Sequence, residues 1–496
     1  MLKVSLSRRQ FRERSRQGNL IPVFRQLLGD TLTPISIFLR FEGDRSRHSF
    51  LLESVINNEQ IGRNSFIGVN PRAVLRGRDR SFRIESPTGD VIESFEGDPL
   101  EFLKRFMESA KPVADARLPA FFGGAVGFLS YDLIRYYEKL PDQNIDDLQQ
   151  DDAYLLLTDE SVIVDHVERH VRLVVNVRTE DFESVDRAYD HALQCLDRME
   201  ERLRTPRPDP EPPPLRGPMP IESNMTADEF RAIVSRAREY IHAGDIFQVV
   251  LSKRYSFRPG IDAFSIYRGL RAINPSPYMY YLNLGPFQIV GSSPEILVRL
   301  QNSKVVLRPI AGTRRRGRTP AEDLALEQEL LSDQKEIAEH IMLVDLGRND
   351  VGRVSEPGSV RVTEFKAIER YSHVMHIVSH CEGKLAPDLH PYEALRASLP
   401  AGTVSGAPKI RSMEIIDELE NRRRGIYAGC IGYFNYNGDF DTAISIRTMV
   451  FRDDVCYLQA GAGVVFDSKP ELECEEVANK VRGMLAAVRF ARRGFQ

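Results

Sequence analysis

The sequence predicts an α+β protein, because short β-rich runs occupy its first half and strands alternate with helical segments in its second half. Runs such as 154–165 and 170–177 are rich in Val, Ile and Leu and are broken by Gly and Asp turns, which is typical of antiparallel sheet. Between the halves lies a proline-rich stretch, 205–220, in which neither a helix nor an inner strand can persist, since proline lacks a backbone donor.

We therefore divide the chain into an N-terminal region, residues 1–204, an extended linker, residues 205–224, and a C-terminal region, residues 225–496. The N-terminal region is expected to be mostly antiparallel sheet with few helices. One large domain, or two closely fused ones, fits the length of 496 residues.

The C-terminal region begins with a predicted helix behind Thr226, a residue type that caps helix N-termini, and this helix should stop at Gly244. A strand, 246–252, is expected directly after it. The segment around Arg447 is also expected to be a strand. Further strands are predicted at 288–291, 431–436 and 457–460, and helices at 333–346, 391–399 and 470–492.

Composition excludes several classes of partner. The net charge is only −4, so no strong field would draw the protein to nucleic acid or to an anionic membrane. The basic run 314–318 has no interleaved aromatic residues, unlike a nucleic-acid site. The five cysteines form no C-x-x-C motif, and no apolar stretch is long enough to span a bilayer. We therefore expect a cytoplasmic protein without nucleic-acid or membrane partners.

Two predicted helices each carry a pair of glutamates three residues apart. Glu336 and Glu339 form one pair, and Glu473 and Glu476 form the other. Residues at this spacing project from one face of a helix. Carboxylates without Cys or His ligands nearby suit a hard cation such as Mg²⁺ better than Zn²⁺. The alternative is that each pair consists of solvated surface side chains, which is the more common case for a glutamate pair judged by its sequence alone.

Glycine-rich and basic segments offer groups that suit an anion. Gly312, Gly461 and Gly463 would let backbone N–H groups approach a carboxylate closely, because no Cβ intervenes. Arg447 can bind a carboxylate with two parallel hydrogen bonds. The hydroxyls of Thr313 and Tyr427 can add directional contacts. Each of these residues, taken singly, fits a role in folding as well as one in binding.

Several long blocks together resemble the chorismate-utilising enzyme family. They are GDIFQVVLS (244–252), NPSPYM (274–279), GSSPE (291–295), PIAGTRRRG (309–317), KEIAEHIMLVDLGRND (335–350), YSHVMH (371–376) and PAGTVSGAPK (400–409), together with the C-terminal glutamates. Before the linker, LLES (51–54) and GGAVGFLSYD (123–132) resemble the N-terminal region of the family. The resemblance therefore covers most of the chain.

The resemblance implies a fold, a cofactor and a set of roles. The implied fold is a large β-sheet sandwich flanked by helices. The implied Mg²⁺ site consists of Glu339 and Glu476, with Glu336 and Glu473 beside them. Glu295 resembles the general acid, and His376, aided by Thr403, resembles the group that serves pyruvate elimination. The implied substrate-binding set is Gly312, Thr313, Tyr427, Arg447, Gly461, Ala462, Gly463 and Lys480.

Two positions distinguish this chain from related members of the family. Members that add water typically have a lysine base where this chain has Gln248, and ammonia needs no such base. Members that form aminodeoxychorismate typically have a nucleophilic lysine where this chain has Ala311. The expected reaction is ammonia addition to chorismate followed by pyruvate loss, which gives anthranilate for tryptophan synthesis. The alternatives are an enzyme that stops at aminodeoxyisochorismate, an aminodeoxychorismate synthase, or a non-catalytic subunit that senses tryptophan.

The resemblance also implies a partner and an inhibitor. No cysteine stands in a glutaminase-like G-x-C-x-G setting, so ammonia should come from a separate glutamine amidotransferase subunit in a hetero-oligomer. The blocks LLES and NPSPYM resemble a feedback site for L-tryptophan, which Ser54, Pro277, Tyr278 and Met279 would line. The alternative is that these four are ordinary turn and core residues.

Overall fold

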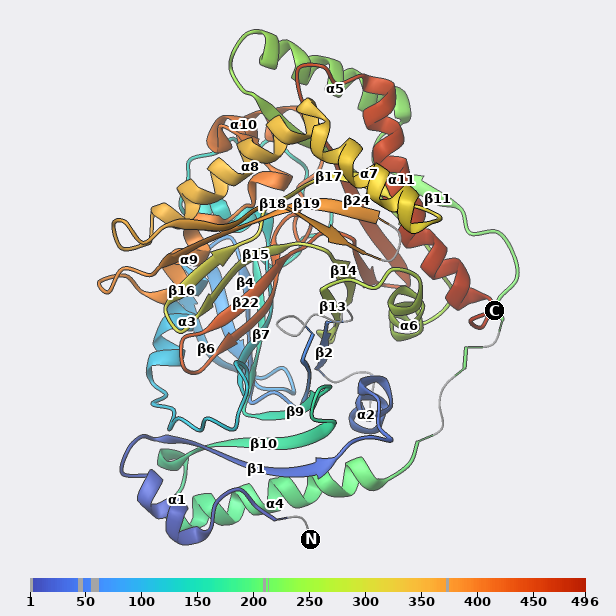
Figure 1. Ribbon diagram of the computed structural model, residues 1–496. Helices are drawn as coiled ribbons and strands as arrows, with labels where there is room; N and C mark the ends of the chain where they lie inside the picture. The colour runs from blue at the N-terminus through green and yellow to red at the C-terminus, as the bar shows by residue number, and fades with distance from the viewer. Residues whose placement is uncertain (1–2, 43–47, 55–61, 208–210, 213, 372–373) are drawn as a thin grey trace.

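Two large sheets pack face to face and helices cover their outer faces, as Figure 1 shows. The computed structural model describes residues 3–42, 48–54, 62–207, 211–212, 214–371 and 374–496. Phe50 and Ile163 of one sheet share an apolar core with Val126 and Phe128 of the other. The predicted sandwich is therefore confirmed.

The first sheet contains twelve strands, and its pairings are antiparallel. Their order is β1 (Leu20–Leu28), β10 (His170–Arg178), β9 (Glu160–Asp165), β3 (Asn64–Val69), β2 (Ser49–Glu53), β13 (Tyr278–Asn283), β14 (Gln288–Ser293), β23 (Thr448–Arg452), β24 (Val455–Val464), β12 (Gln248–Phe257) and β11 (Ile221–Ser223), with β20 (Gly406–Ala407) also beside β12.

The second sheet also contains twelve strands. Their order is β17 (Ile310–Arg315), β19 (Val374–Lys384), β16 (Lys304–Leu307), β15 (Ile296–Gln301), β22 (Phe440–Ile444), β21 (Cys430–Asn435), β7 (Gly124–Leu129), β8 (Ala153–Thr158), β4 (Ala73–Arg78), β5 (Ser81–Glu85) and β6 (Val91–Glu96), with β18 (Arg361–Arg370) also beside β19.

The helices lie on the outside of this sandwich (Figure 1). Those against the first sheet are α1 (Arg8–Arg14), α2 (Pro34–Phe41), α4 (Val185–Arg204), α5 (Ala227–His242), α6 (Ala263–Ile273), α10 (Lys409–Leu419) and α11 (Pro470–Arg492). The others are α3 (Pro99–Glu108), α7 (Pro320–Ser332), α8 (Gln334–Gly352) and α9 (Pro391–Ser398), together with the short 3₁₀ turns η1 (Tyr131–Tyr136), η2 (Thr179–Asp181) and η3 (Gly402–Val404).

Both sheets contain strands from both sides of the proline-rich linker. Strand β2 pairs with β13, which places Glu53 opposite Met279. Strand β7 pairs with β21, which places Leu129 opposite Cys430. The N-terminal region thus shares its hydrogen-bonded sheets with the C-terminal region. In the linker itself, β11 forms an edge strand, and residues 208–210 and 213 lie outside the described residues.

Several predicted elements agree with the structure. The Thr226 side chain caps α5, and Glu229 completes a reciprocal capping box. Helix α11 spans Pro470–Arg492, as its apolar spacing predicts, with a proline in its first turn. Helix α8 runs six residues beyond the predicted 333–346 segment, to Gly352.

Three predictions were wrong in detail. The run 154–165 is two strands, β8 and β9, which belong to different sheets because the chain crosses between the sheets at Asp159. The N-terminal region is richer in helix than expected, since α4 alone spans Val185–Arg204. Arg447 lies between β22 and β23 with φ +50°, a left-handed conformation that cannot continue a strand.

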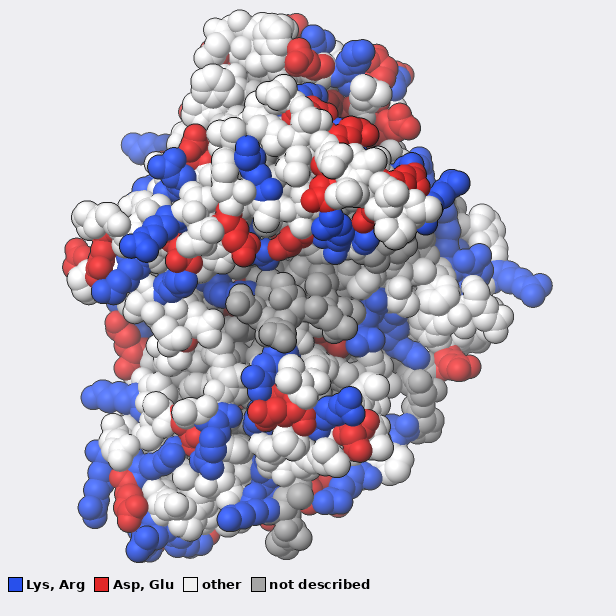
Figure 2. Space-filling model, viewed as in Figure 1, with Lys and Arg blue, Asp and Glu red and all other residues white. Residues whose placement is uncertain are grey.

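Figure 2 shows basic and acidic side chains interspersed over the visible face, with no broad area of one sign. Within the described residues, no helix is both long and apolar enough to cross a membrane. The five cysteines are all unpaired.

Candidate functional site

The two predicted glutamate pairs lie on α8 and α11, beside the ends of β12, β17 and β24. Gln248, the first residue of β12, donates a hydrogen bond from Nε2 to Oε1 of Glu339 at 3.1 Å. A Cβ built on Gly463 of β24 would lie 3.8 Å from the same carboxylate oxygen. Gly312 of β17 has φ +66°, and a Cβ there would lie 3.2 Å from the Glu336 carboxylate. The glycines therefore allow both sheets to approach the carboxylates of α8.

The charges of the four glutamates act on one another. The pKa of Glu339 is raised to about 7, mainly by burial and also by the carboxylates of Glu336, Glu476 and Glu473, while Lys335 acts in the opposite direction. Burial is also the main cause of the raised pKa of Glu473. This repulsion shows that α8 and α11 bring the two pairs near each other. It disfavours the ionised form of Glu339 until a cation is present.

The donor set fits a hard divalent cation, although the carboxylates are not gathered as ligands. Among the described residues, no three His, Cys, Asp or Glu side chains form a group that could hold a metal ion. Glu476 is instead paired with Lys480 at 2.7 Å, and Glu336 with Arg314 at 3.2 Å. Oxygen donors are the ligands that Mg²⁺ prefers. A bound Mg²⁺ would also offset the repulsion between the carboxylates that contributes to the raised pKa of Glu339. These glutamates are therefore the residues that could hold the predicted Mg²⁺.

Next to the carboxylates lies a group of cationic and hydroxyl side chains. Lys480 donates from Nζ to the Gly461 carbonyl at 2.7 Å. A Cβ on Gly461 would lie only 2.8 Å from the Tyr427 hydroxyl, so a larger residue would displace that tyrosine. Burial raises the pKa of Tyr427 to about 12, which keeps its phenol protonated and able to donate. Ala462 is buried in β24 between the two glycines.

Arg447 brings a positive charge to this group without an ion-pair partner. Burial lowers the pKa of its guanidinium, while Tyr427 and Glu476 act in the opposite direction. No ion pair joins this guanidinium to a carboxylate in the part of the chain that the structure describes. A half-buried arginine of this kind favours an anionic ligand, and a carboxylate fits its planar fork.

Glu295 lies between β14 and β15 as a buried acid. Burial raises its pKa to about 8, and the nearby Thr403 and Lys480 oppose this shift only in part. The carboxyl group is therefore mostly protonated at neutral pH and can donate a proton. The buried Thr403 hydroxyl lies beside this carboxyl group and has no other hydrogen-bond partner among the described residues.

His376 of β19 lies opposite Thr313 of β17, at the edge of the second sheet. Its Nδ1 lies 3.0 Å from the Gly312 carbonyl and 3.0 Å from the Thr313 hydroxyl. Since a carbonyl can only accept, Nδ1 carries the proton and Nε2 keeps its lone pair. Burial lowers the pKa of His376, so the imidazole is neutral at neutral pH. It can therefore act as a base.

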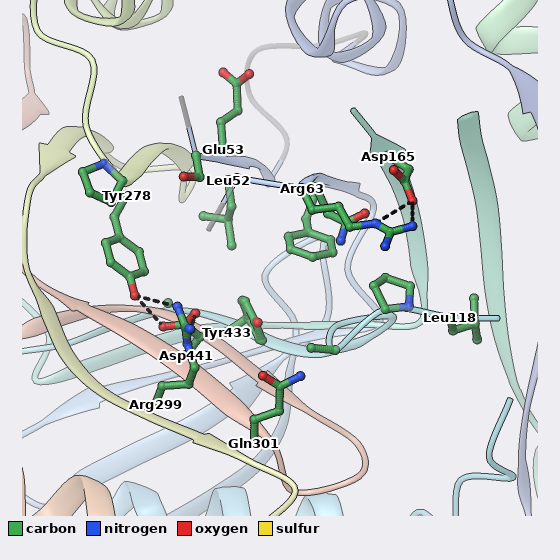
Figure 3. A pocket seen from close by; sticks show the side chains of 18 of the residues that line it. Leu52, Glu53, Arg63, Leu118, Asp165, Tyr278, Arg299, Gln301, Tyr433 and Asp441 are labelled. Carbon is green, nitrogen blue, oxygen red and sulfur yellow. Dashed lines mark hydrogen bonds and ion pairs between the residues drawn. The ribbon is translucent and has the colours of Figure 1, made fainter. Parts of the chain in front are cut away.

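A separate cavity of about 600 Å³ lies between the sheets, and Figure 3 shows its lining. All four residues predicted to bind an effector line it, namely Ser54, Pro277, Tyr278 and Met279. Strand pairing explains why segments so far apart in sequence meet, because β2 and β13 are neighbours. The volume fits a small molecule.

The floor of this cavity is a closed polar network. The Tyr278 hydroxyl donates to Asp441 at 3.0 Å, and Arg299 binds the same carboxylate at 2.8 Å. Figure 3 shows these three side chains converging from three strands, β13, β15 and β22. The Ser54 hydroxyl is the exception, because it is buried and has no hydrogen-bond partner among the residues that the structure describes. It is thus free to bind a ligand.

Sequence reasoning missed the charged residues around this cavity. Glu53 points away from it in Figure 3 and binds the Tyr267 hydroxyl and Arg271 of α6. Arg299 and Asp441 meet only because β15 pairs with β22. The position of Glu53 within the LLES block was the one available signal.

Comparison with known proteins gives one family and many close relatives. Residues 48–486 match the model of the chorismate binding enzyme family. Anthranilate synthase component 1 of Acetivibrio thermocellus is 47% identical over 95% of this chain and 96% of that protein. The protein of the same name from Aquifex aeolicus is 45% identical over 99% of both chains.

Solved structures agree with these relatives. Anthranilate synthase component I from Streptococcus pneumoniae has a TM-score of 0.78 and 38% identity, covering 92% of this chain and 98% of that one. The menaquinone-specific isochorismate synthase of Escherichia coli has a TM-score of 0.69 at 19% identity, covering 96% of this chain and 97% of that one. The second similarity shows the shared fold alone.

Proposed function

This chain belongs to the family of chorismate binding enzymes and groups with anthranilate synthase component 1, and from that premise we propose which residues perform the reaction. The reaction adds ammonia to chorismate with loss of the ring hydroxyl as water. Pyruvate is then lost and the ring becomes aromatic. One observation supports this assignment of the site above all. The buried and protonated acid Glu295 occurs together with Glu339, a carboxylate that suits a cation, and with Arg447, a guanidinium that suits an anion.

Chorismate, a dianion, binds between the glutamates and the cationic group. Glu339 and Glu476, with Glu336 and Glu473, hold Mg²⁺, which offsets the repulsion between these carboxylates and a substrate carboxylate. Arg447 and the Tyr427 hydroxyl bind a carboxylate. Backbone N–H groups of β17 and β24 complete the set, which comprises Gly312, Thr313, Tyr427, Arg447, Gly461, Ala462, Gly463 and Lys480.

Glu295 protonates the departing hydroxyl. Its raised pKa of about 8 supports this role, because a carboxyl group with an ordinary pKa would be ionised at neutral pH. The buried Thr403 hydroxyl beside it is available to orient the acid or the substrate.

His376 serves the second half of the reaction. Its neutral imidazole accepts a proton at Nε2 as pyruvate leaves, while the Gly312 carbonyl holds Nδ1–H and fixes the ring. Gln248 occupies the position near Glu339 where a base for water would be needed, and its amide cannot deprotonate water. This supports ammonia as the nucleophile.

Ammonia comes from a glutamine amidotransferase subunit that binds this chain. The name component 1, carried by the relatives, supports a second component. L-Tryptophan occupies the cavity between β2 and β13 and inhibits the enzyme. The unpaired Ser54 hydroxyl and the position of Tyr278 in that cavity support this proposal.

Product identification tests the proposed function. Purified protein is incubated with chorismate, Mg²⁺ and ammonium at pH 8.5, where a useful share of ammonium is deprotonated. We expect fluorescent anthranilate and an equal amount of pyruvate. Accumulation of aminodeoxyisochorismate without pyruvate would mean that the enzyme stops halfway, and no turnover would leave a sensing role.

A further inference from the structure

Arg424 is a buried arginine outside the proposed catalytic set. Only 1% of its side chain is exposed, and 3% of that of its partner Glu420. The guanidinium makes four hydrogen bonds. Two go to the Glu420 carboxylate at 3.0 and 2.6 Å, one to the Val404 carbonyl at 2.7 Å and one to the Val250 carbonyl at 2.7 Å.

The two carbonyls belong to segments that carry site residues. Val404 directly follows Thr403, whose hydroxyl lies beside Glu295. Val250 lies in β12, two residues after Gln248, and is paired with Gly463 of β24. One guanidinium therefore joins the turn that carries Thr403 to the strands beside Glu339.

The third connection runs through the backbone and the ring of Tyr427. The Arg424 carbonyl accepts a hydrogen bond from the Tyr427 N–H at 3.2 Å. The guanidinium carbon lies 5.6 Å from the Tyr427 ring centre and 4.8 Å from the Tyr131 ring centre. The two rings thus hold the plane of the guanidinium by cation–π contact.

Glu420 fixes the guanidinium from the opposite side. Its Oε1 also accepts hydrogen bonds from the Ser252 N–H at 2.7 Å and from the Ser252 hydroxyl at 2.8 Å. Gln459 of β24 donates to that hydroxyl at 2.8 Å. Every carboxylate oxygen is therefore bonded, which is what a buried ion pair needs to persist.

We propose that Arg424, held by Glu420, is a positioning residue that fixes Tyr427, Thr403 and β12 relative to one another. The proposal rests on the proposed function, in which Tyr427 binds the substrate and Thr403 assists the chemistry. Arg424 touches neither the substrate nor the reacting atoms. It acts by holding three separate backbone segments at fixed separations.

The chemistry of the side chain explains why an arginine occupies this place. Four acceptors from two directions must be reached in one plane, and the guanidinium has a rigid fork of five N–H donors. A lysine keeps the charge but has one ammonium nitrogen, which cannot reach both carbonyls and both carboxylate oxygens. Arg424→Lys therefore removes the clamp while leaving Glu420 neutralised.

The test compares Arg424→Lys with Arg25→Lys. Arg25 is also buried, with 4% of its side chain exposed, and it binds Asp197 and Glu200 of α4, far along the chain from the site. Both variants lose hydrogen bonds of a buried arginine. Activities are measured well below the lower melting temperature, so that loss of folded protein does not enter.

For Arg424→Lys we expect kcat to fall by about tenfold to a hundredfold, because misplaced reacting groups cost that much. We also expect KM for chorismate to rise several-fold, because Tyr427 moves. Arg25→Lys should change neither constant, even at an equal loss of melting temperature. Unchanged kcat and KM in Arg424→Lys, or equal changes in both variants, would overturn the proposal.

A second readout does not depend on activity. In Arg424→Lys, the backbone amides of 249–252, 402–405 and 425–428 should exchange hydrogen at least tenfold faster than in the wild type, whereas Arg25→Lys should leave them protected. If the wild type makes no anthranilate, the proposed function fails while this result still decides the clamp. Unchanged exchange in these three segments would overturn it.

Discussion

The proposed catalytic site and the proposed effector cavity differ in how their charged groups are paired. In the cavity, Arg299, Asp441 and Tyr278 bond to one another, so its floor is complete without a ligand. In the catalytic site, Arg447 has no ion pair among the described residues, and Glu339 faces other carboxylates. Within the described residues, the buried Gln248 Oε1 there also lacks a hydrogen-bond partner, and the Thr403 hydroxyl has none besides the Glu295 carboxyl group.

The difference indicates what each site needs from its ligand. Unpaired buried groups reduce the free energy of unfolding, and they persist where a ligand completes them. In the proposed catalytic site, Mg²⁺ and a dianionic substrate would supply the missing partners. The proposed effector cavity would instead select by shape and by the Ser54 hydroxyl, which has no hydrogen-bond partner among the described residues. Mutations should accordingly affect the two sites in different ways.

The largest expected effect comes from the buried acid of the catalytic site. Glu295→Gln keeps the shape of the side chain but removes the transferable proton. We expect kcat to fall by about a hundredfold to ten-thousandfold, the usual contribution of a general acid. Steady-state anthranilate fluorescence measures this.

The matched control is Asp439→Asn. Asp439 is also a buried acid, and burial raises its pKa too, but it lies in a turn and binds the Asn302 backbone. Its substitution should leave kcat unchanged. Comparable activity of Glu295→Gln and the wild type would remove Glu295 from the chemistry.

The next effect separates the two half-reactions. His376→Ala should slow pyruvate release by about a hundredfold, since a general base is lost, while ammonia addition continues. Aminodeoxyisochorismate should then accumulate, as followed by chromatography. The control is His380→Ala on the same strand, whose imidazole pairs with Glu382 and should not affect product ratios. An equal loss of both half-reactions in His376→Ala would contradict the assigned role.

A smaller effect is expected in the effector cavity. Ser54→Ala removes the free hydroxyl, so the tryptophan concentration for half-inhibition should rise by about tenfold, equivalent to one hydrogen bond. Turnover without tryptophan should not change. Ser49→Ala is a matched control, because the Ser49 hydroxyl is equally buried and unpaired on β2 but does not line the cavity. Equal inhibition of both variants would place the effector elsewhere.

The smallest effect concerns stability without metal. The folded-state pKa of Glu339 is about 7, above the ordinary 4.5, so folding favours the protonated form. The stability that this group contributes is complete below pH 4.5 and is lost as the pH rises through about 7. We expect the melting temperature to fall by a few degrees over this range.

Glu339→Gln should remove that part of the pH dependence, and Mg²⁺ should reverse it in the wild type, because a cation favours the ionised form. Glu475→Gln, an exposed neighbour on α11, should behave like the wild type. Scanning calorimetry measures the pH dependence of the melting temperature, first in a chelating buffer and then with Mg²⁺ in excess. The same slope in Glu339→Gln and the wild type would show that other groups cause it.

The sequence predicted local features better than contacts between distant segments. The α11 helix was predicted to the residue because Pro470 and its apolar spacing are local signals. The glutamate pairs followed from helical spacing, and the family blocks named the remaining site residues. The crossing between sheets at Asp159 was not predicted, since the short polar stretch 158–161 fits a simple turn within one sheet equally well.

Buried polar pairs account for most of what was missed. Glu53 meets Tyr267 of α6 although 214 positions separate them in the sequence, and no local pattern marks such a pair. Arg424 likewise lies in the basic run 422–424, a pattern that is typical of an exposed segment. Its environment follows only from the packing of α10 against β12. The left-handed conformation of Arg447 was not predicted either, because it depends on tertiary packing and not on a local sequence pattern.

The central claim is that carboxylates of α8 and α11 bind one divalent cation together. Mn²⁺ binding tests this claim most directly. Electron paramagnetic resonance counts the bound ions with chorismate present. We predict one ion per chain in the wild type and at least tenfold weaker binding in both Glu339→Gln and Glu476→Gln. Unchanged binding in either variant would contradict the claim that the two helices share a cation.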